Sequence, residues 1–262
     1  MNQGLDVFKE GDDVLLVSSR GKRRIVKIQG ERIHTHKGYL VTSDIIGKNP
    51  GIIVRTHVGE EMLALRPSIA DYIPKLTRRT QVIYPKDIGY VVLSLGVSSG
   101  SMVLEAGTGS GAATMVIASL VKPNGRVFSC DINEESIEIA RRNLERVGLT
   151  NYVELIHGDI KSIDFKVLFD AAIIDIPDPW NTLRKIVGFL KTSARICIVV
   201  PTMNQLEKVY RAMLEANIAH LETVEIMLRR IRPFEGRVRP ESIMIGHTAY
   251  LMIGAKIIRE NI

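Results

Sequence analysis

Cysteine, tryptophan and long apolar runs are scarce in this chain. Its 262 residues include two cysteines, Cys130 and Cys197, and a single tryptophan, Trp180. Each cysteine lies in an apolar stretch typical of a strand, which favours two buried thiols over a disulfide and indicates a reducing, cytoplasmic environment. A membrane span needs about 20 consecutive apolar residues, and no apolar run in this sequence is that long. The first residues carry no basic segment followed by an apolar one, so we expect neither a signal peptide nor a membrane partner.

Metal ligands and paired nucleophiles are also few. His34 and His36 alternate along one predicted strand, but no third ligand accompanies them, so we expect no metal site. Neither cysteine has a histidine partner nearby in the sequence, which argues against a covalent cysteine mechanism.

Basic residues are in moderate excess. The formal net charge is +6 and the isoelectric point about 9.3, which is consistent with a polyanionic partner, although many basic proteins bind no nucleic acid. The length and the hydrophobic content of 45% suit one large domain with a small one.

Residues 1–66 are predicted to form a small N-terminal β domain, either a barrel or a sandwich. Short candidate strands alternate with glycine turns, at 13–18, 24–29, 32–36 and 52–55. The basic loop from Arg20 to Arg24 fits two interpretations equally, a contact with nucleic acid or a solvated hairpin turn.

Residues 67–262 are predicted to form an α/β domain. A segment of helical character, 68–76, leads to the basic pair Arg78-Arg79, and Pro85 suits the first turn of a helix that runs to about Leu95. Beyond residue 101, strands and helices alternate, which predicts a doubly wound parallel sheet. The expected strands are 102–106, 126–130, 152–156, 169–175, 194–200, 220–231 and 248–258, and the expected helices are 112–121, 133–147, 183–190 and 203–216.

A strand, a glycine turn and a helix form the central motif. The strand 102–106 is followed by Gly107, Gly109 and Gly111, and the helix begins at Ala112. Glycines let the backbone turn sharply and approach a ligand closely, as in nucleotide-binding units. A dinucleotide and S-adenosylmethionine both fit such a turn. A pyrophosphate prefers bare amides, whereas the methyl donor carries an ammonium and a sulfonium and tolerates Glu105 beside it, so the turn favours S-adenosylmethionine.

Four acidic residues fall at the ends of successive strands: Glu105, Asp131, Asp159 and Asp175. Ligands of open parallel sheets bind outside the carboxyl ends of the strands, so we expect these acids to share one site. Asp131 is placed to accept the two ribose hydroxyls of a nucleoside, and Asp159 to accept its adenine amino group. After Asp175, Pro177 and Pro179 stiffen the turn and Trp180 adds an aromatic face.

These residues make the chain similar to the class I methyltransferases. The run 105–111, Asp131, Asp159 and the stretch 174–180 carry that resemblance. More narrowly, the chain resembles the TrmI family, which methylates N1 of adenine in the T-loop of tRNA. Three further pieces match this family: 81–87, 200–205 and 239–251. The similarity extends from about residue 78 to 255, whereas in residues 1–66 it is architectural only.

The resemblance implies a fold, a reaction and an assembly. The fold is a Rossmann-like sheet, mostly parallel with an antiparallel C-terminal strand. The reaction is methyl transfer from S-adenosylmethionine to N1 of adenine 58 in tRNA, with adenine 57 a further target in some archaeal members, and the assembly is a homotetramer. The lysine, arginine and isoleucine usage resembles that of archaeal proteins.

Three alternatives stay open at this point. A class I methyltransferase for another RNA, a protein or a small molecule would keep the glycines and Asp131 but need no basic arm. A dehydrogenase is disfavoured by the presence of both Glu105 and Asp159 at the strand ends. A non-catalytic tRNA-binding subunit would be expected to have lost the glycine turn or Asp175.

The resemblance also implies roles for individual residues. Asp175 is expected to hold the N1 and amino edge of the adenine and to stabilise its developing charge, with Tyr84 closing over the pocket. Expected donor contacts are Glu105, Gly107, Thr108, Gly109, Ser110, Gly111, Ala112, Asp131, Ile132, Ser136, Asp159, Ile160 and Asp175. Expected substrate contacts are Pro177, Trp180, Arg237, Arg239, His247 and Thr248.

The adenine must be exposed from the folded tRNA before it can react, which requires a grip on the backbone. Five arginines between positions 229 and 239, together with Arg78 and Arg79, suit that task because a guanidinium binds phosphate bidentately. A solvated strand end is the other interpretation of this cluster.

Overall fold

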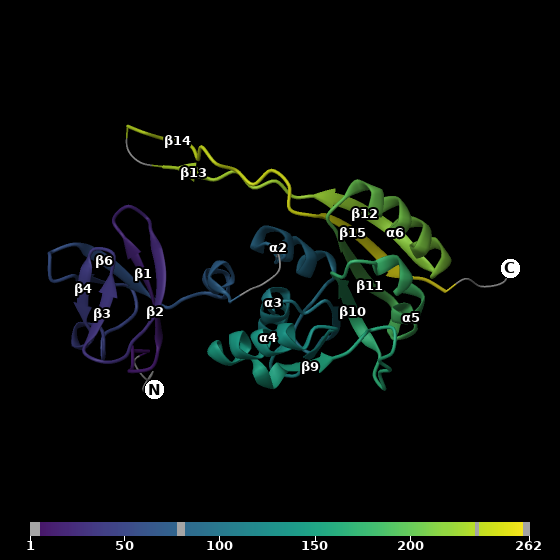
Figure 1. The fold of residues 1–262 in the computed structure, drawn as a ribbon, viewed down its shortest axis with the longest axis horizontal. Coiled ribbons are helices and arrows are strands. Elements are labelled where there is room, and N and C mark those ends of the chain that lie inside the picture. Colours follow the sequence, from purple (N-terminus) through teal and green to yellow (C-terminus); the bar gives the residue numbers. More distant parts are fainter. Residues whose placement is uncertain (1–5, 78–81, 234–235, 259–262) are drawn as a thin grey trace. The chain divides into compact units, whose positions relative to one another are not determined.

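The chain divides into two compact units, Met1–Lys75 and Leu76–Ile262, in a computed structural model that describes residues 6–77, 82–233 and 236–258 (Figure 1). Arg78, Arg79, Gln81 and Phe234 lie outside the described residues. Neither a helix with the length and apolar character of a membrane span nor a cluster of three potential metal ligands occurs among the residues described.

The small unit is built from short antiparallel strands. β1 (Asp13–Ser18), β2 (Arg23–Lys27), β5 (Ile52–Arg55) and β6 (Glu61–Leu65) form one sheet in the order β2-β1-β6-β5, and β3 (Arg32–Thr35) pairs with β4 (Gly38–Val41), which leads into η1 (Thr42–Asp44). Phe8, Leu16, Ile28 and Leu40 are fully buried between them. Strands β4 and β6 were not predicted.

The boundary between the units falls after Lys75, not after residue 66. Helix α1 (Ile69–Tyr72) and the turn η2 (Ile73–Lys75) stay with the small unit. Arg23 pairs with Asp71 at 3.3 Å, and the hydroxyl of Tyr72 donates to Asp13 at 3.1 Å. These contacts connect residues far apart in the sequence, so the pattern of the linker alone does not reveal them.

A seven-stranded sheet forms the centre of the large unit (Figure 1). Its order is β12-β15-β11-β10-β7-β8-β9, and only β15 runs antiparallel to its neighbours, as the resemblance implied. The strands are β7 (Met102–Ala106), β8 (Arg126–Asp131), β9 (Val153–His157), β10 (Phe169–Ile174), β11 (Leu190–Val200), β12 (Ile218–Glu225) and β15 (Tyr250–Lys256). The helices are α2 (Pro85–Ser94), α3 (Ala112–Val121), α4 (Glu134–Arg146), α5 (Leu183–Gly188) and α6 (Met203–Glu215), with short turns η3 (Thr150–Tyr152) and η4 (Pro179–Asn181).

The two faces of this sheet carry different residues of the same strands. Leu104, Ala106 and Ile174 pack in one core with Leu183 of α5 and Met213 of α6. Side chains alternate along a strand, so Glu105 points to the opposite face, where its carboxylate meets α3. Both cysteines are free and buried, as predicted.

The strand predicted over residues 220–231 ends earlier than expected. β12 pairs with β15 only as far as Glu225, and the chain then leaves the sheet as an arm, defined here as residues 227–246 (Figure 1). The arm carries the hairpin β13 (Ile231–Arg232) and β14 (Arg239–Pro240). Apolar residues beyond Glu225, such as Met227 and Ile231, remain exposed, so the apolar sequence continues where the sheet does not.

Candidate active site

The glycine turn between β7 and α3 requires its glycines. Gly107 has φ +97°, and a Cβ at that position would overlap the carbonyl oxygen of Asp175 at the end of β10. Gly111 has φ +79°, and a Cβ there would lie 3.1 Å from the Cβ of Ala140 in α4. The turn therefore lies directly against the ends of the neighbouring elements, and only a residue without a side chain permits that approach.

Two backbone amides hold Asp131, the last residue of β8, in place. The amide of Gly109 donates to Oδ2 of Asp131 at 2.9 Å, and the amide of Asn133 donates to Oδ1 at 2.9 Å. Asn133 caps α4, as predicted, by accepting from the amides of Glu135 and Ser136. The carboxylate is thereby fixed beside the glycine turn, and each oxygen keeps a lone pair for a ligand hydroxyl.

A cleft of about 800 Å³ opens at the carboxyl ends of the strands. It brings together nine of the predicted residues: Gly107, Gly109, Asp131, Ile132, Ser136, Asp159, Ile160, Asp175 and Pro177. Ile132 is 71% exposed at its edge, whereas Ile160 is buried in its wall. Acidic groups that accept hydrogen bonds thus alternate with apolar surface, an arrangement suited to a nucleoside.

The cleft also contains residues that the sequence did not single out as contacts: Asn133, Lys161, Asp178, Pro201 and Gln205. Pro201 and Gln205 follow β11, the fifth parallel strand, so the rule used for the four acids could have found them. Asp178 and Lys161 form an ion pair at 2.8 Å, a contact that depends on tertiary structure.

A smaller hollow of about 20 Å³ shares Gly107, Gly109 and Asp175 with the cleft. Its other lining residues are Val82, Ile83, Glu105, Thr108, Ser110, Ala112 and Ala113. The hydroxyl of Ser110 is buried there without a hydrogen-bond partner among the described residues. An orphaned polar atom inside a lined hollow indicates that a bound molecule completes the site.

Two carboxyl groups of this site have raised pKa values. Burial, and secondarily the negative charge of Asp131, raises the pKa of Asp175 to about 6, and in the described part of the chain no donor reaches its half-buried carboxylate. Glu105 is only 2% exposed, and burial raises its pKa to about 7 although Ser129 and Thr114 hydrogen-bond to it. Because both anions are poorly solvated, a cationic ligand in the cleft is favoured over an anionic one.

Other predicted residues lie away from the cleft lining. Trp180 lies in η4 and packs against the core, with Nζ of Lys208 4.9 Å from its ring centre. It is not among the residues that line the cleft. Tyr84 precedes α2 directly after Val82 and Ile83 of the small hollow. Arg237 and Arg239 are exposed on the arm.

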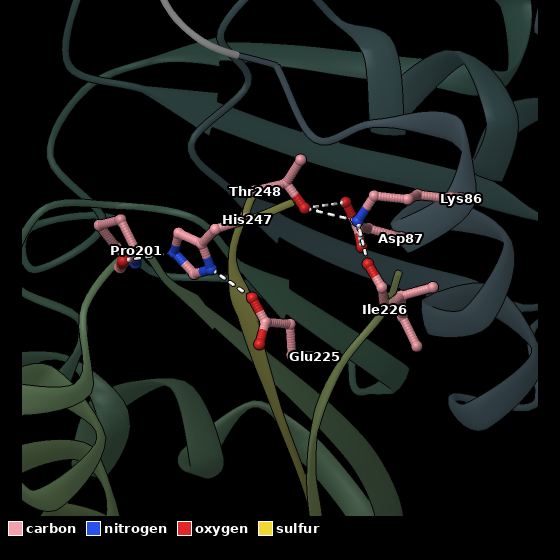
Figure 2. Close-up of polar contacts among 7 residues, drawn as sticks. All are labelled: Lys86, Asp87, Pro201, Glu225, Ile226, His247 and Thr248. Carbon is pink, nitrogen blue, oxygen red and sulfur yellow. Dashed lines mark hydrogen bonds and ion pairs between the residues drawn. The ribbon is translucent and has the colours of Figure 1, made fainter. Parts of the chain in front are cut away.

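His247 and Thr248 lie at the root of the arm, which we define as Glu225, Ile226, His247 and Thr248, the residues that flank it on both sides. Both side chains bind other residues of the chain (Figure 2). The ring of His247 is bonded to Glu225 and to the carbonyl of Pro201, at 2.6 and 2.8 Å. The hydroxyl of Thr248 donates to Asp87 at 2.8 Å. These two predicted substrate contacts are therefore already engaged within the protein.

Known families and proteins similar to this chain were identified by comparison. Residues 63–239 match the family model of the tRNA methyltransferase complex GCD14 subunit, and residues 7–54 match the TrmI-like N-terminal model. The chain is 33% identical to the tRNA (adenine(57)-N(1)/adenine(58)-N(1))-methyltransferase TrmI of Methanocaldococcus jannaschii, over 91% of this chain and 93% of that protein.

Two solved structures are similar over almost the whole chain. One is the tRNA (m1A58) methyltransferase TrmI of Aquifex aeolicus, with a TM-score of 0.86 and 33% identity over 97% of this chain and 100% of that one. The other is an S-adenosylmethionine-dependent O-methyltransferase of Thermotoga maritima, with a TM-score of 0.91 and 34% identity over 98% and 97%.

Proposed function

We propose that this chain, which belongs to the family of the tRNA methyltransferase complex GCD14 subunit, transfers a methyl group from S-adenosylmethionine to N1 of adenine in tRNA. The observation that carries this proposal is the half-buried carboxylate of Asp175, which lacks a donor among the described residues. The backbone carbonyl of the same residue lies against the glycine turn, and both border the small hollow. We take adenine 58 as the target. Adenine 57 is a second candidate, because the relative from M. jannaschii is named for both positions.

The residues of the cleft fit the methyl donor, which supplies a methyl group bound to a positively charged sulfur. Three features support this fit. Gly107 leaves backbone without a side chain facing the site, and the hydroxyl of Ser110 has no partner among the described residues. The carboxyl groups of Glu105 and Asp175 are poorly solvated. Asp131 would hold the ribose hydroxyls and Asp159 the adenine amino group, between the apolar side chains of Ile132 and Ile160. Glu105 would remain beneath the turn and compensate positive charge from there.

Asp175 would act on the base that receives the methyl group. Adenine N1 is a weak nucleophile, and the base becomes cationic when it is methylated. A carboxylate that accepts a hydrogen bond from the exocyclic amino group orients N1 and gains attraction as the charge develops, so it stabilises the transition state more than the ground state. Pro177 would border the base, and Tyr84 would close the pocket from the start of α2.

The tRNA backbone would be held by the arm. Arg229, Arg230 and Arg232 precede its hairpin turn, and Arg237 and Arg239 follow it. We also propose a homotetramer. The arm carries exposed apolar side chains, with Met227 and Ile243 exposed by 70% and 85%, and such surface is typical of an interface.

The decisive experiment is incubation of the protein with unmodified tRNA transcript and labelled donor, followed by mapping of the modified nucleotide. N1-methyladenosine at position 58 supports the proposal. The T. maritima relative is named an O-methyltransferase, so a small hydroxylated acceptor is the comparison substrate. Methylation of that acceptor with no label in tRNA would contradict the proposal.

A further inference from the structure

Two sequence motifs that lie far apart in the chain meet at the root of the arm. Lys86 and Asp87, in the first turn of α2, lie beside Ile226 and Thr248, where the arm begins and ends (Figure 2). The side chains of Lys86 and Asp87 are only 8% and 1% exposed. A buried ion pair is expensive to desolvate, so it contributes more to a defined geometry than to stability.

The hydrogen bonds of this cluster form a closed set. Nζ of Lys86 donates to Oδ1 of Asp87 at 2.7 Å, to the carbonyl of Ile226 at 2.6 Å and to the hydroxyl of Thr248 at 2.6 Å. The hydroxyl of Thr248 donates in turn to Oδ2 of Asp87 at 2.8 Å. All three ammonium protons and both carboxylate oxygens are used, so another arrangement would leave a buried charge unpaired.

A second contact at the same root involves His247. Its two ring nitrogens meet a carboxylate oxygen of Glu225, the last residue of β12, and the carbonyl of Pro201 (Figure 2). Both partners are acceptors, so they favour the doubly protonated ring, and the hydrogen bonds to Glu225 and to the Pro201 carbonyl raise the pKa of His247. One side chain thereby connects the two strands of the root to the loop after β11.

Both contacts connect the root with walls of the active site. Lys86 and Asp87 follow Val82 and Ile83, which border Asp175 in the small hollow. Pro201 lines the donor cleft with Gln205, whose amide donates to the carbonyl of Pro177 at 3.4 Å. A shift of the root would therefore displace the arm relative to both walls.

We propose that Lys86, Asp87 and Thr248, together with His247 and Glu225, are positioning residues that hold the arm at a defined place beside the active site, so that RNA gripped by the arm presents its base to Asp175. This inference rests on the proposed function. It assigns these residues a role in the placement of bound RNA and not in its affinity, because none of them is free to hold phosphate.

Thr248→Val tests this role, since it keeps the shape of the side chain and removes the hydroxyl. We expect the single-turnover rate at saturating tRNA to fall about 10-fold or more, because small displacements of a reacting group are costly. The dissociation constants for tRNA and for S-adenosylmethionine should stay within about 2-fold of wild type, because the arginines and the cleft are intact. Thr248→Ser should restore the rate, and Thr223→Val, on the exposed side of β12, should not change it.

Each outcome is informative. A wild-type rate in Thr248→Val would overturn the inference and leave the proposed function standing, and so would a lower melting temperature with an unchanged saturating rate. If Thr248→Val does not fold, Glu225→Gln on the exposed side of the root should lower the saturating rate with donor affinity retained, and a wild-type rate there would overturn the inference. A wild-type protein that leaves tRNA unmethylated would overturn the proposed function and this inference with it.

Discussion

At the scale of the residue, Asp175 is expected to combine a cost in stability with a benefit in rate. Its pKa is raised from 3.8 to about 6. Between these two pH values the carboxyl group is therefore protonated in the folded protein and ionised in the unfolded chain. The folded state then binds more protons in this window, and stability falls as the pH rises through it. At neutral pH the ionised carboxylate opposes folding in the free protein, which is typical of groups kept for function.

Asp175→Asn separates these two effects, because it keeps the shape and removes the charge. We expect a higher melting temperature at pH 7 and a methylation rate lower by about 10²–10³ under single turnover. In wild type, the rate constant should decline below about pH 6, and the variant should lack this decline. A variant as fast as wild type would mean that the carboxylate only forms the turn.

At the scale of the element, the glycine turn limits which side chains the proposed donor site tolerates. Gly107→Ala places a methyl group against the carbonyl of Asp175 at φ +97° and should abolish donor binding measured by calorimetry. Gly89→Ala in α2, where a Cβ meets nothing within 4 Å, is the matched control and should be neutral or stabilising by up to about 1 kcal/mol. Donor affinity retained in Gly107→Ala would contradict the assignment of the cleft.

The arm is the element expected to bind phosphate. Replacement of Arg237 and Arg239 by alanine should weaken tRNA binding and lower the steepness of its salt dependence by about 1–2 in a log–log plot. Arg211→Ala on α6, an exposed arginine paired with Glu207 at 2.9 Å, is the control and should leave the slope unchanged. An unchanged slope in the double variant would exclude backbone contacts by these two residues.

At the scale of the whole molecule, the exposed apolar residues of the arm lead us to expect a homotetramer. Sedimentation should show a species of four chains of 29.2 kDa each, because an interface between chains would bury the exposed apolar side chains of the arm. Met227→Lys with Ile243→Lys should shift the distribution to smaller species, whereas Val58→Lys on the small unit should not. A monomeric wild type, or a double variant that stays tetrameric, would contradict this expectation.

Much of the large unit could be predicted because its signals are local. An apolar strand, a glycine turn and a helix follow one another within residues 102–121, and the structure has β7 and α3 there. Parallel strands bring their carboxyl ends to one edge, so acids as distant in sequence as Asp131 and Asp175 could be placed in one cleft without any knowledge of their contacts. The sequence by itself therefore determined most strands of the large sheet, the glycine turn and the acids around it.

Only the tertiary structure decided the rest, because it depends on contacts between distant residues. Apolar residues continue beyond Glu225 to Ile231, yet β12 ends at Glu225, where pairing with β15 stops. Lys86 and Thr248 each belong to a motif recognised in the sequence, but no periodicity indicates that they bond to each other. Local patterns encode which face of an element is apolar, whereas the partner of a buried charge is chosen by the packing of the whole chain.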